Sequence, residues 1–170
     1  MKRLFLLRHA KSSWEDPELA DYDRPLAPRG RRATKLIGAH LRRESVVPAV
    51  VLCSSARRAR ETLERIAPAL GAQVPVQIER DLYAASEQAL LDRLRALDDG
   101  VESVLLIGHN PGIERLALSL AGGGPGLASV GHKFPTAALA TLEFDGRWRE
   151  LGASSAELTH FVTPKRLAQR

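Results

Sequence analysis

Cysteine, aromatic side chains and long apolar runs are all scarce in this chain of 170 residues. Its one cysteine, Cys53, cannot form an internal disulfide and cannot build a zinc site from cysteines. This usage is typical of a reducing compartment, so we expect a cytoplasmic protein. The longest apolar runs have about five residues, whereas a membrane span needs about 20. The sequence therefore predicts no membrane span, and the run after the first three residues is too short for a signal peptide.

Aromatic residues make up 5% of the chain, whereas 25 lysines and arginines outnumber 20 acidic residues and give a net charge of +5. Proteins that bind single-stranded nucleic acid place aromatic side chains among basic ones so that bases can stack. This sequence shows no such interleaving, and we expect no nucleic-acid partner. A phosphorylated or otherwise anionic substrate explains the basic excess equally well.

The length fits one domain, 1–170, with a core large enough to need no disulfide or structural metal. Short apolar runs predict buried strands at residues 4–7, 50–53 and 104–107, and alternation predicts another at 74–78. Apolar residues at helical spacing predict helices within 33–41, 59–70 and 90–97. Asn110 and Pro111 predict the start of a further helix, as N-cap and first-turn residue.

Two late strands are predicted at residues 136–144 and 148–152, joined by a turn at Asp145-Gly146. The alternation of strands and helices predicts an α/β fold, a three-layer sandwich with a mostly parallel central sheet flanked by helices. The late pair predicts an antiparallel edge strand. We expect loops at 16–28 and 122–126, and a basic tail at 163–170 that frays.

Unusual polar residues follow three of the predicted strands. The first strand leads into Arg8-His9, the second into Ser54-Ser55 with Arg57-Arg58 beyond, and the third into Gly108-His109. Ligands bind at the carboxyl ends of strands in open α/β sheets, so these side chains should meet at one crevice. Arginines suit phosphate, and a histidine can act as nucleophile or acid–base group. The combination predicts phosphoryl transfer through histidine.

Other candidate residues have simpler interpretations. His40 is expected to be structural, His132 and His160 are given no role, and Cys53 is expected to be a buried strand thiol. A cysteine phosphatase needs an arginine six positions after its cysteine, and that position from Cys53 is Ala59. The cysteine mechanism therefore fails on spacing.

Several motifs together resemble the histidine phosphatase superfamily, and more narrowly the small phosphohistidine phosphatases of the SixA type. They run in the family's order from residue 4 to about 113, and jointly they are specific. These are Leu6-Leu7-Arg8-His9-Ala10-Lys11-Ser12-Ser13-Trp14, Asp23-Arg24-Pro25-Leu26 with Arg29-Gly30, Ser54-Ser55-Ala56-Arg57-Arg58-Ala59-Arg60-Glu61-Thr62, Asp81-Leu82-Tyr83 and Gly108-His109-Asn110-Pro111. Ala10 stands where the superfamily commonly has glycine, and the SixA-like branch often carries alanine there.

The resemblance implies a phosphoglycerate mutase-like fold and a metal-independent phosphatase without cofactors. His9 would be the nucleophile, and Arg8, Arg58 and His109 would hold the phosphoryl oxygens. The family pattern places the functional arginine directly before the alanine and four residues ahead of the threonine, which selects Arg58 over Arg57. No phosphate-binding loop of the Walker type is present.

The resemblance also points to residues 79–83 for the general acid, with Asp81 first and Glu79 second. Ser12 and Arg24 would contact phosphate or substrate. Lys11 would screen an acidic substrate or simply be exposed.

We expect a phosphorylated protein as substrate, with phosphohistidine as the group hydrolysed, because a short chain favours an open site. A small-molecule phosphatase, a phosphoglycerate mutase-like transferase and a non-catalytic phosphopeptide-binding module remain alternatives. The sequence does not settle the oligomeric state.

Overall fold

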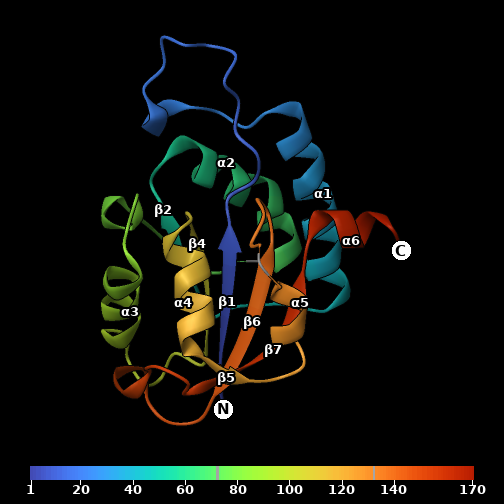
Figure 1. Cartoon of the computed structure of the whole chain (residues 1–170). Coiled ribbons are helices and arrows are strands. Elements are labelled where there is room, and N and C mark those ends of the chain that lie inside the picture. Colours follow the sequence, from blue (N-terminus) through green and yellow to red (C-terminus); the bar gives the residue numbers. More distant parts are fainter. Residues whose placement is uncertain (72, 132) are drawn as a thin grey trace.

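The computed structural model describes residues 1–71, 73–131 and 133–170, and in them one sheet holds the strands in the order β3-β2-β4-β1-β6-β7-β5. Figure 1 shows β1 near the middle of this sheet, with helices on both faces. The strands are β1 (Lys2–Arg8), β2 (Val50–Ser54), β3 (Val76–Glu79), β4 (Ser103–Gly108), β5 (Ala121–Gly123), β6 (Leu139–Phe144) and β7 (Ala156–Val162).

Two helical layers enclose the sheet. One face is covered by α1, α2 and α6, and the other by α3 and α4. The helices are α1 (Pro28–Arg43), α2 (Arg57–Ile66), α3 (Glu87–Arg95), α4 (Gly112–Leu120), α5 (Leu127–Val130) and α6 (Pro164–Ala168). Short 3₁₀ turns, which position parts of the site, are η1 (Asp21–Asp23), η2 (Ala67–Leu70), η3 (Arg80–Leu82) and η4 (Trp148–Glu150).

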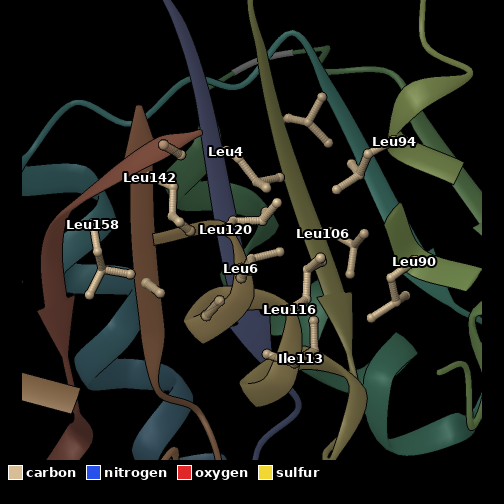
Figure 2. Close-up of a cluster of buried hydrophobic side chains, with 14 of the residues drawn as sticks. Leu4, Leu6, Leu90, Leu94, Leu106, Ile113, Leu116, Leu120, Leu142 and Leu158 are labelled. Atoms are coloured by element: carbon tan, nitrogen blue, oxygen red, sulfur yellow. The ribbon is translucent and has the colours of Figure 1, made fainter. Parts of the chain in front are cut away.

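Alternation of side chains along β1 supplies both halves of the core. Leu4 and Leu6 face α3 and α4, whereas Phe5 and Leu7 face α1 and α2. Figure 2 shows the first cluster, in which Leu4, Leu6 and Leu106 from the strands lie against leucines of the helices. Burial on both faces is why these strands read as continuous apolar runs rather than as alternating patterns.

The predicted α/β class and its flanking helices are confirmed. β3, β2, β4 and β1 are all parallel, and β6 runs antiparallel to β1 and β7. The antiparallel strand is therefore present, but it lies between β1 and β7 rather than at an edge.

The prediction of a strand at 148–152 is wrong. Those residues include the 3₁₀ turn η4, and the indole nitrogen of the fully buried Trp148 donates to the carbonyl oxygen of Val101 at 2.7 Å. The strand that pairs with β6 is β7, which the sequence analysis missed. A large aromatic residue after the turn at Asp145-Gly146 favoured the prediction of a strand, but Trp148 is instead packed in the core.

Three local predictions also need correction. The tail is not frayed throughout, because α6 is capped by Thr163, whose hydroxyl accepts from the Arg166 backbone nitrogen, and its Leu167 is buried. The glycine-rich segment contains β5, which pairs with β7. Helix α4 begins at Gly112 rather than at Pro111, although the Asn110 side-chain oxygen still accepts from the backbone nitrogen of Glu114 at 3.2 Å.

Gly30 in α1 lets this helix pack directly against the loop that follows β1. A Cβ atom there would overlap the carbonyl oxygen of Lys11, whereas a Cβ at Gly38 of the same helix meets only the Ala69 side chain at 4.0 Å.

We therefore expect Gly30→Ala to lower the free energy of unfolding by about 1–3 kcal/mol, as overpacking does. Gly38→Ala is the matched control and should raise the free energy of unfolding by up to about 1 kcal/mol, because alanine favours a helix. Urea unfolding of both variants measures the difference. Equal effects of the two substitutions would contradict the packing argument.

In the described parts of the chain, no helix is long and apolar enough to cross a bilayer.

Candidate active site

The site forms where parallel strands end together. β4 pairs with both β1 and β2, so the segments that follow the three strands emerge side by side. His9 follows β1 and His109 follows β4, and their ring centroids lie 5.0 Å apart. Both side chains are buried.

His9 is held in one tautomer by the backbone of the next residue. Its Nδ1 lies 2.7 Å from the carbonyl oxygen of Ala10, which can only accept, so Nδ1 carries the proton. Nε2 is then left with a lone pair, and the Nε of Arg58 lies 3.4 Å from it. Burial is the main cause that lowers the pKa of His9 to about 3, and His109, Arg58 and Arg8 lower it further. His9 is therefore a neutral ring with a free nitrogen at pH 7.

His109 faces the same space from the neighbouring strand. Its Nε2 lies 2.7 Å from the Ser54 hydroxyl at the end of β2. Its Nδ1 is buried and has no hydrogen-bond partner among the described residues. Burial and then Arg58 lower the pKa of His109 to about 4. The ring can thus offer a polar nitrogen to a bound group.

Arg58 lies in the first turn of α2, at the positive end of the helix dipole. Its guanidinium donates to the Asp21 carbonyl oxygen at 2.7 Å and to the Asp21 carboxylate at 2.9 Å. The Thr62 hydroxyl donates to the Arg58 carbonyl and accepts from the backbone nitrogen of Ala10. That hydroxyl fixes α2 to the loop that carries His9.

Arg8, at the end of β1, is the second arginine whose charge acts on His9. One of its terminal nitrogens donates to the carbonyl oxygen of Phe134 at 3.0 Å. The same oxygen accepts a hydrogen bond from the side-chain nitrogen of Asn110 at 2.9 Å. Its Nε is buried without a partner in the described residues. Burial is the main cause that lowers the pKa of Arg8.

Sequence reasoning missed Asp21, and it placed Tyr83 in a family segment without giving its side chain a role. The Asp21 carboxylate accepts from the Tyr83 hydroxyl at 2.7 Å and from Arg58, and it lies 3.5 Å from Arg24. The hydrogen bond from Tyr83 is the main cause that lowers the pKa of Asp21. Tyr83 in turn packs against His109, with ring centroids 5.5 Å apart. A carboxylate three residues before Arg24 was a signal, but only the folded loop brings it to Arg58.

Ser12 and Arg24 are brought together in the same loop. A terminal nitrogen of Arg24 donates to the Ser12 hydroxyl, both side chains are buried, and the guanidinium stacks 3.3 Å from the centre of the Trp14 ring. Lys11 has an exposed side chain, and its carbonyl oxygen accepts from the Ala27 backbone nitrogen.

The two candidate acids differ in their surroundings. Glu79 is paired with Arg93 through both carboxylate oxygens at 2.8 Å. Asp81 is exposed on η3, and in the described residues its carboxylate has no hydrogen bond or ion pair with the two histidines or Arg58. Asp81 as general acid stays a prediction.

The remaining candidates lie outside this cluster. Arg57 is paired with Glu61 on the surface of α2. Burial raises the pKa of the Cys53 thiol to about 12, so this cysteine is unreactive at pH 7. His40 is buried in α1, His160 is exposed on β7, and His132 lies outside the described residues. Within the described ranges, no three His, Cys, Asp or Glu side chains are grouped to hold a metal ion.

The buried histidines make stability depend on pH. An unfolded histidine gains a proton near pH 6.5, whereas folded His9 stays neutral down to about pH 3. Between these values the unfolded state binds more protons, so the free energy of unfolding falls as the pH is lowered. At pH 5, His9 should account for about 2 kcal/mol of this fall.

We expect His9→Asn to reduce the difference in unfolding free energy between pH 7.5 and pH 5 by about that amount. His160→Asn, at an exposed position, serves as control. Urea titrations at both pH values give the measurement, and an unchanged pH dependence in His9→Asn would show that folded His9 titrates normally.

Known proteins match this fold and sequence along most of the chain. The family model of the histidine phosphatase superfamily (branch 1) matches residues 4–87. An uncharacterized protein of Mycobacterium leprae is 41% identical over 167 residues, covering 94% of this chain and all of the relative. The phosphohistidine phosphatase SixA of Escherichia coli is 28% identical over 145 residues, covering 84% of this chain and 86% of that protein.

Solved structures agree. The structure of a candidate phosphohistidine phosphatase SixA from Nakamurella multipartitia superimposes with a TM-score of 0.80 at 30% identity, covering 96% of both chains. The fold and family define a phosphatase, as predicted. The chain belongs to the histidine phosphatase superfamily and within it is of the SixA type.

Proposed function

We propose that this protein removes phosphate from phosphohistidine in proteins, through a covalent phosphohistidine formed on its own His9. The observation that carries the proposal is the state of His9. It is buried, its Nδ1 is bound to the Ala10 carbonyl, and its neutral Nε2 lies beside Arg58. Such a nitrogen is a nucleophile with two arginines nearby to bind the phosphoryl group that it attacks.

In the first step, His9 Nε2 attacks the phosphorus in line. A bond forms between this nitrogen and phosphorus, and the bond from phosphorus to the substrate nitrogen breaks. Arg8, Arg58 and His109 hold the equatorial oxygens, where negative charge is spread in the transition state. In the second step, water attacks the phosphorus of phosphorylated His9, which releases inorganic phosphate and restores the ring.

The terminal nitrogens of Arg58 donate hydrogen bonds to Asp21, and some of these bonds must break before the same nitrogens can bind the phosphoryl group. The Asp21 carboxylate lies 2.9 Å from Arg58 and is also bound by Tyr83, so it holds the guanidinium in place before substrate arrives. We infer that Asp21 positions Arg58.

Two features support phosphohistidine as the substrate. The similarity to proteins of the SixA type runs along most of the chain. An imidazole also leaves more readily than an alkoxide, so the reaction needs little help from a strong general acid. This fits the exposed position of Asp81, the predicted acid.

The single, buried thiol fits the expected cytoplasmic location.

Phosphate release from a phosphohistidine peptide and from p-nitrophenyl phosphate, with EDTA throughout, tests the proposal. We expect kcat/KM to be larger for the peptide by about tenfold or more, because the peptide offers binding contacts beside the phosphoryl group that the nitrophenyl group lacks. Activity should survive EDTA. A preference for p-nitrophenyl phosphate would favour a small-molecule phosphatase, and no turnover of either would favour a binding module.

A further inference from the structure

A basic groove runs between α1, α6 and the segment that contains α5. Its volume is about 870 Å³. Apolar side chains line part of it, including Leu36 of α1, Val130 of α5 and Phe161 of β7. Figure 1 shows α1, α5 and α6 close together on one side of the molecule. None of the catalytic roles proposed above uses this groove.

Cationic side chains dominate the groove. Of the residues that the structure describes, no acidic side chain lines it, and six cationic ones do: Lys11, Arg29, Arg32, Lys133, Lys165 and Arg166. All six are exposed. In the described residues none of them forms a salt bridge, whereas Arg57, Arg58 and Arg93 elsewhere are each paired with a carboxylate. The groove therefore presents positive charge that no carboxylate in the described parts of the chain pairs with.

Two segments that line the groove also adjoin the active site. Lys11 lines it and is two residues beyond His9. Lys133 and Pro135 line it too, and the carbonyl oxygen of Phe134 between them accepts from Arg8. A chain bound in the groove would thus lie beside the segment that holds Arg8.

We propose that the groove binds an acidic segment with apolar side chains on the phosphoprotein substrate. This inference rests on the proposed function and adds what part of the substrate is recognised. The unpaired cations attract carboxylates, and the apolar floor accepts aliphatic side chains. A concave, partly apolar surface suits a protein segment better than a flat bilayer. Among the described residues that line the groove, Phe161 is the one aromatic side chain, and it offers little for nucleic-acid bases to stack on.

Two peptides test the proposal. Both carry phosphohistidine, one followed by a segment of glutamate and leucine, and the other with every glutamate replaced by glutamine. We expect the wild-type enzyme to show a kcat/KM about tenfold higher for the acidic peptide at low salt, through KM rather than kcat. In the double variant Lys165→Glu/Arg166→Glu the ratio should fall to about one.

The control variant Arg42→Glu/Arg43→Glu changes the net charge by the same amount on exposed residues of α1 that do not line the groove. It should keep most of the preference for the acidic peptide. Both double variants should hydrolyse p-nitrophenyl phosphate at the wild-type rate, because neither touches the site.

Binding is measured separately, by titrating the unphosphorylated acidic peptide into the wild-type protein and both double variants. Weaker binding that is confined to Lys165→Glu/Arg166→Glu would support the groove as the binding site for the acidic segment. If neither phosphopeptide were hydrolysed, only the proposed function would be overturned. Turnover of both peptides at equal kcat/KM would overturn the proposed binding role of the groove and leave the proposed function intact. Binding to anionic phosphatidylserine vesicles or to RNA, without binding to the acidic peptide, would also overturn it.

Discussion

Replacing His9 by alanine should abolish turnover, with a loss in kcat of about 10⁴-fold or more, as removal of a nucleophile does in other covalent enzymes. His9 supplies a free nitrogen, Nε2, which is neutral at pH 7 and lies 3.4 Å from the Nε of Arg58. Water cannot replace it efficiently, because the in-line position next to the arginines would then hold a weak and poorly oriented nucleophile. Phosphate release from a phosphohistidine peptide measures the effect.

The control for His9→Ala is His160→Ala, which removes an exposed histidine on β7 and should leave activity unchanged. His9→Ala should also unfold cooperatively and still bind inorganic phosphate, because Arg8, Arg58 and His109 remain. Substantial turnover by the folded His9→Ala variant would contradict the nucleophile assignment.

Replacing Arg58 by alanine should lower kcat by about 10²–10⁴-fold, because a group that binds charge developing in the transition state is lost. The loss has two parts. The phosphoryl oxygens lose a buried guanidinium, and the Asp21 carboxylate loses its closest cation. Arg58→Lys should recover only part of the activity, because an ammonium cannot hold Asp21 and a phosphoryl oxygen in one planar fork.

The neighbouring arginine gives a matched control. Arg57→Ala removes the same side chain one residue away, where it is half-exposed and paired with Glu61. We expect kcat to change by no more than about twofold, the scale of a surface ion pair. A large loss in Arg57→Ala with little in Arg58→Ala would reverse the assignment of these two residues.

The sequence predicted the main body of the fold because its strands are buried on both faces. Residues 4–7, 50–53 and 104–107 are continuous apolar runs, and β1, β2 and β4 pair in parallel around them. Strands that end together bring the residues after them together, so His9 and His109 could be expected in one place from their positions alone.

Other parts depend on contacts that no local pattern encodes. Asp21 lies 37 residues from Arg58 and 62 from Tyr83, in a loop that has no periodic signal, so its place in the site arises only from the folded chain. Trp148 looked like the start of a strand, yet its indole donates to Val101, 47 residues away, and closes the core. β7 was missed because Thr159 and His160, at its register shift, interrupt the alternation of its buried apolar residues.

The sharpest test of the account is direct detection of the phosphoenzyme. The protein is mixed with a phosphohistidine peptide, quenched in alkali within milliseconds, digested and analysed by mass spectrometry, because phosphohistidine survives alkali. We predict a transient phosphoryl group on His9, formed as fast as the peptide is dephosphorylated and absent in His9→Ala. Full turnover with no phosphorylated enzyme at any time, or with the phosphoryl group on another residue, would contradict the mechanism.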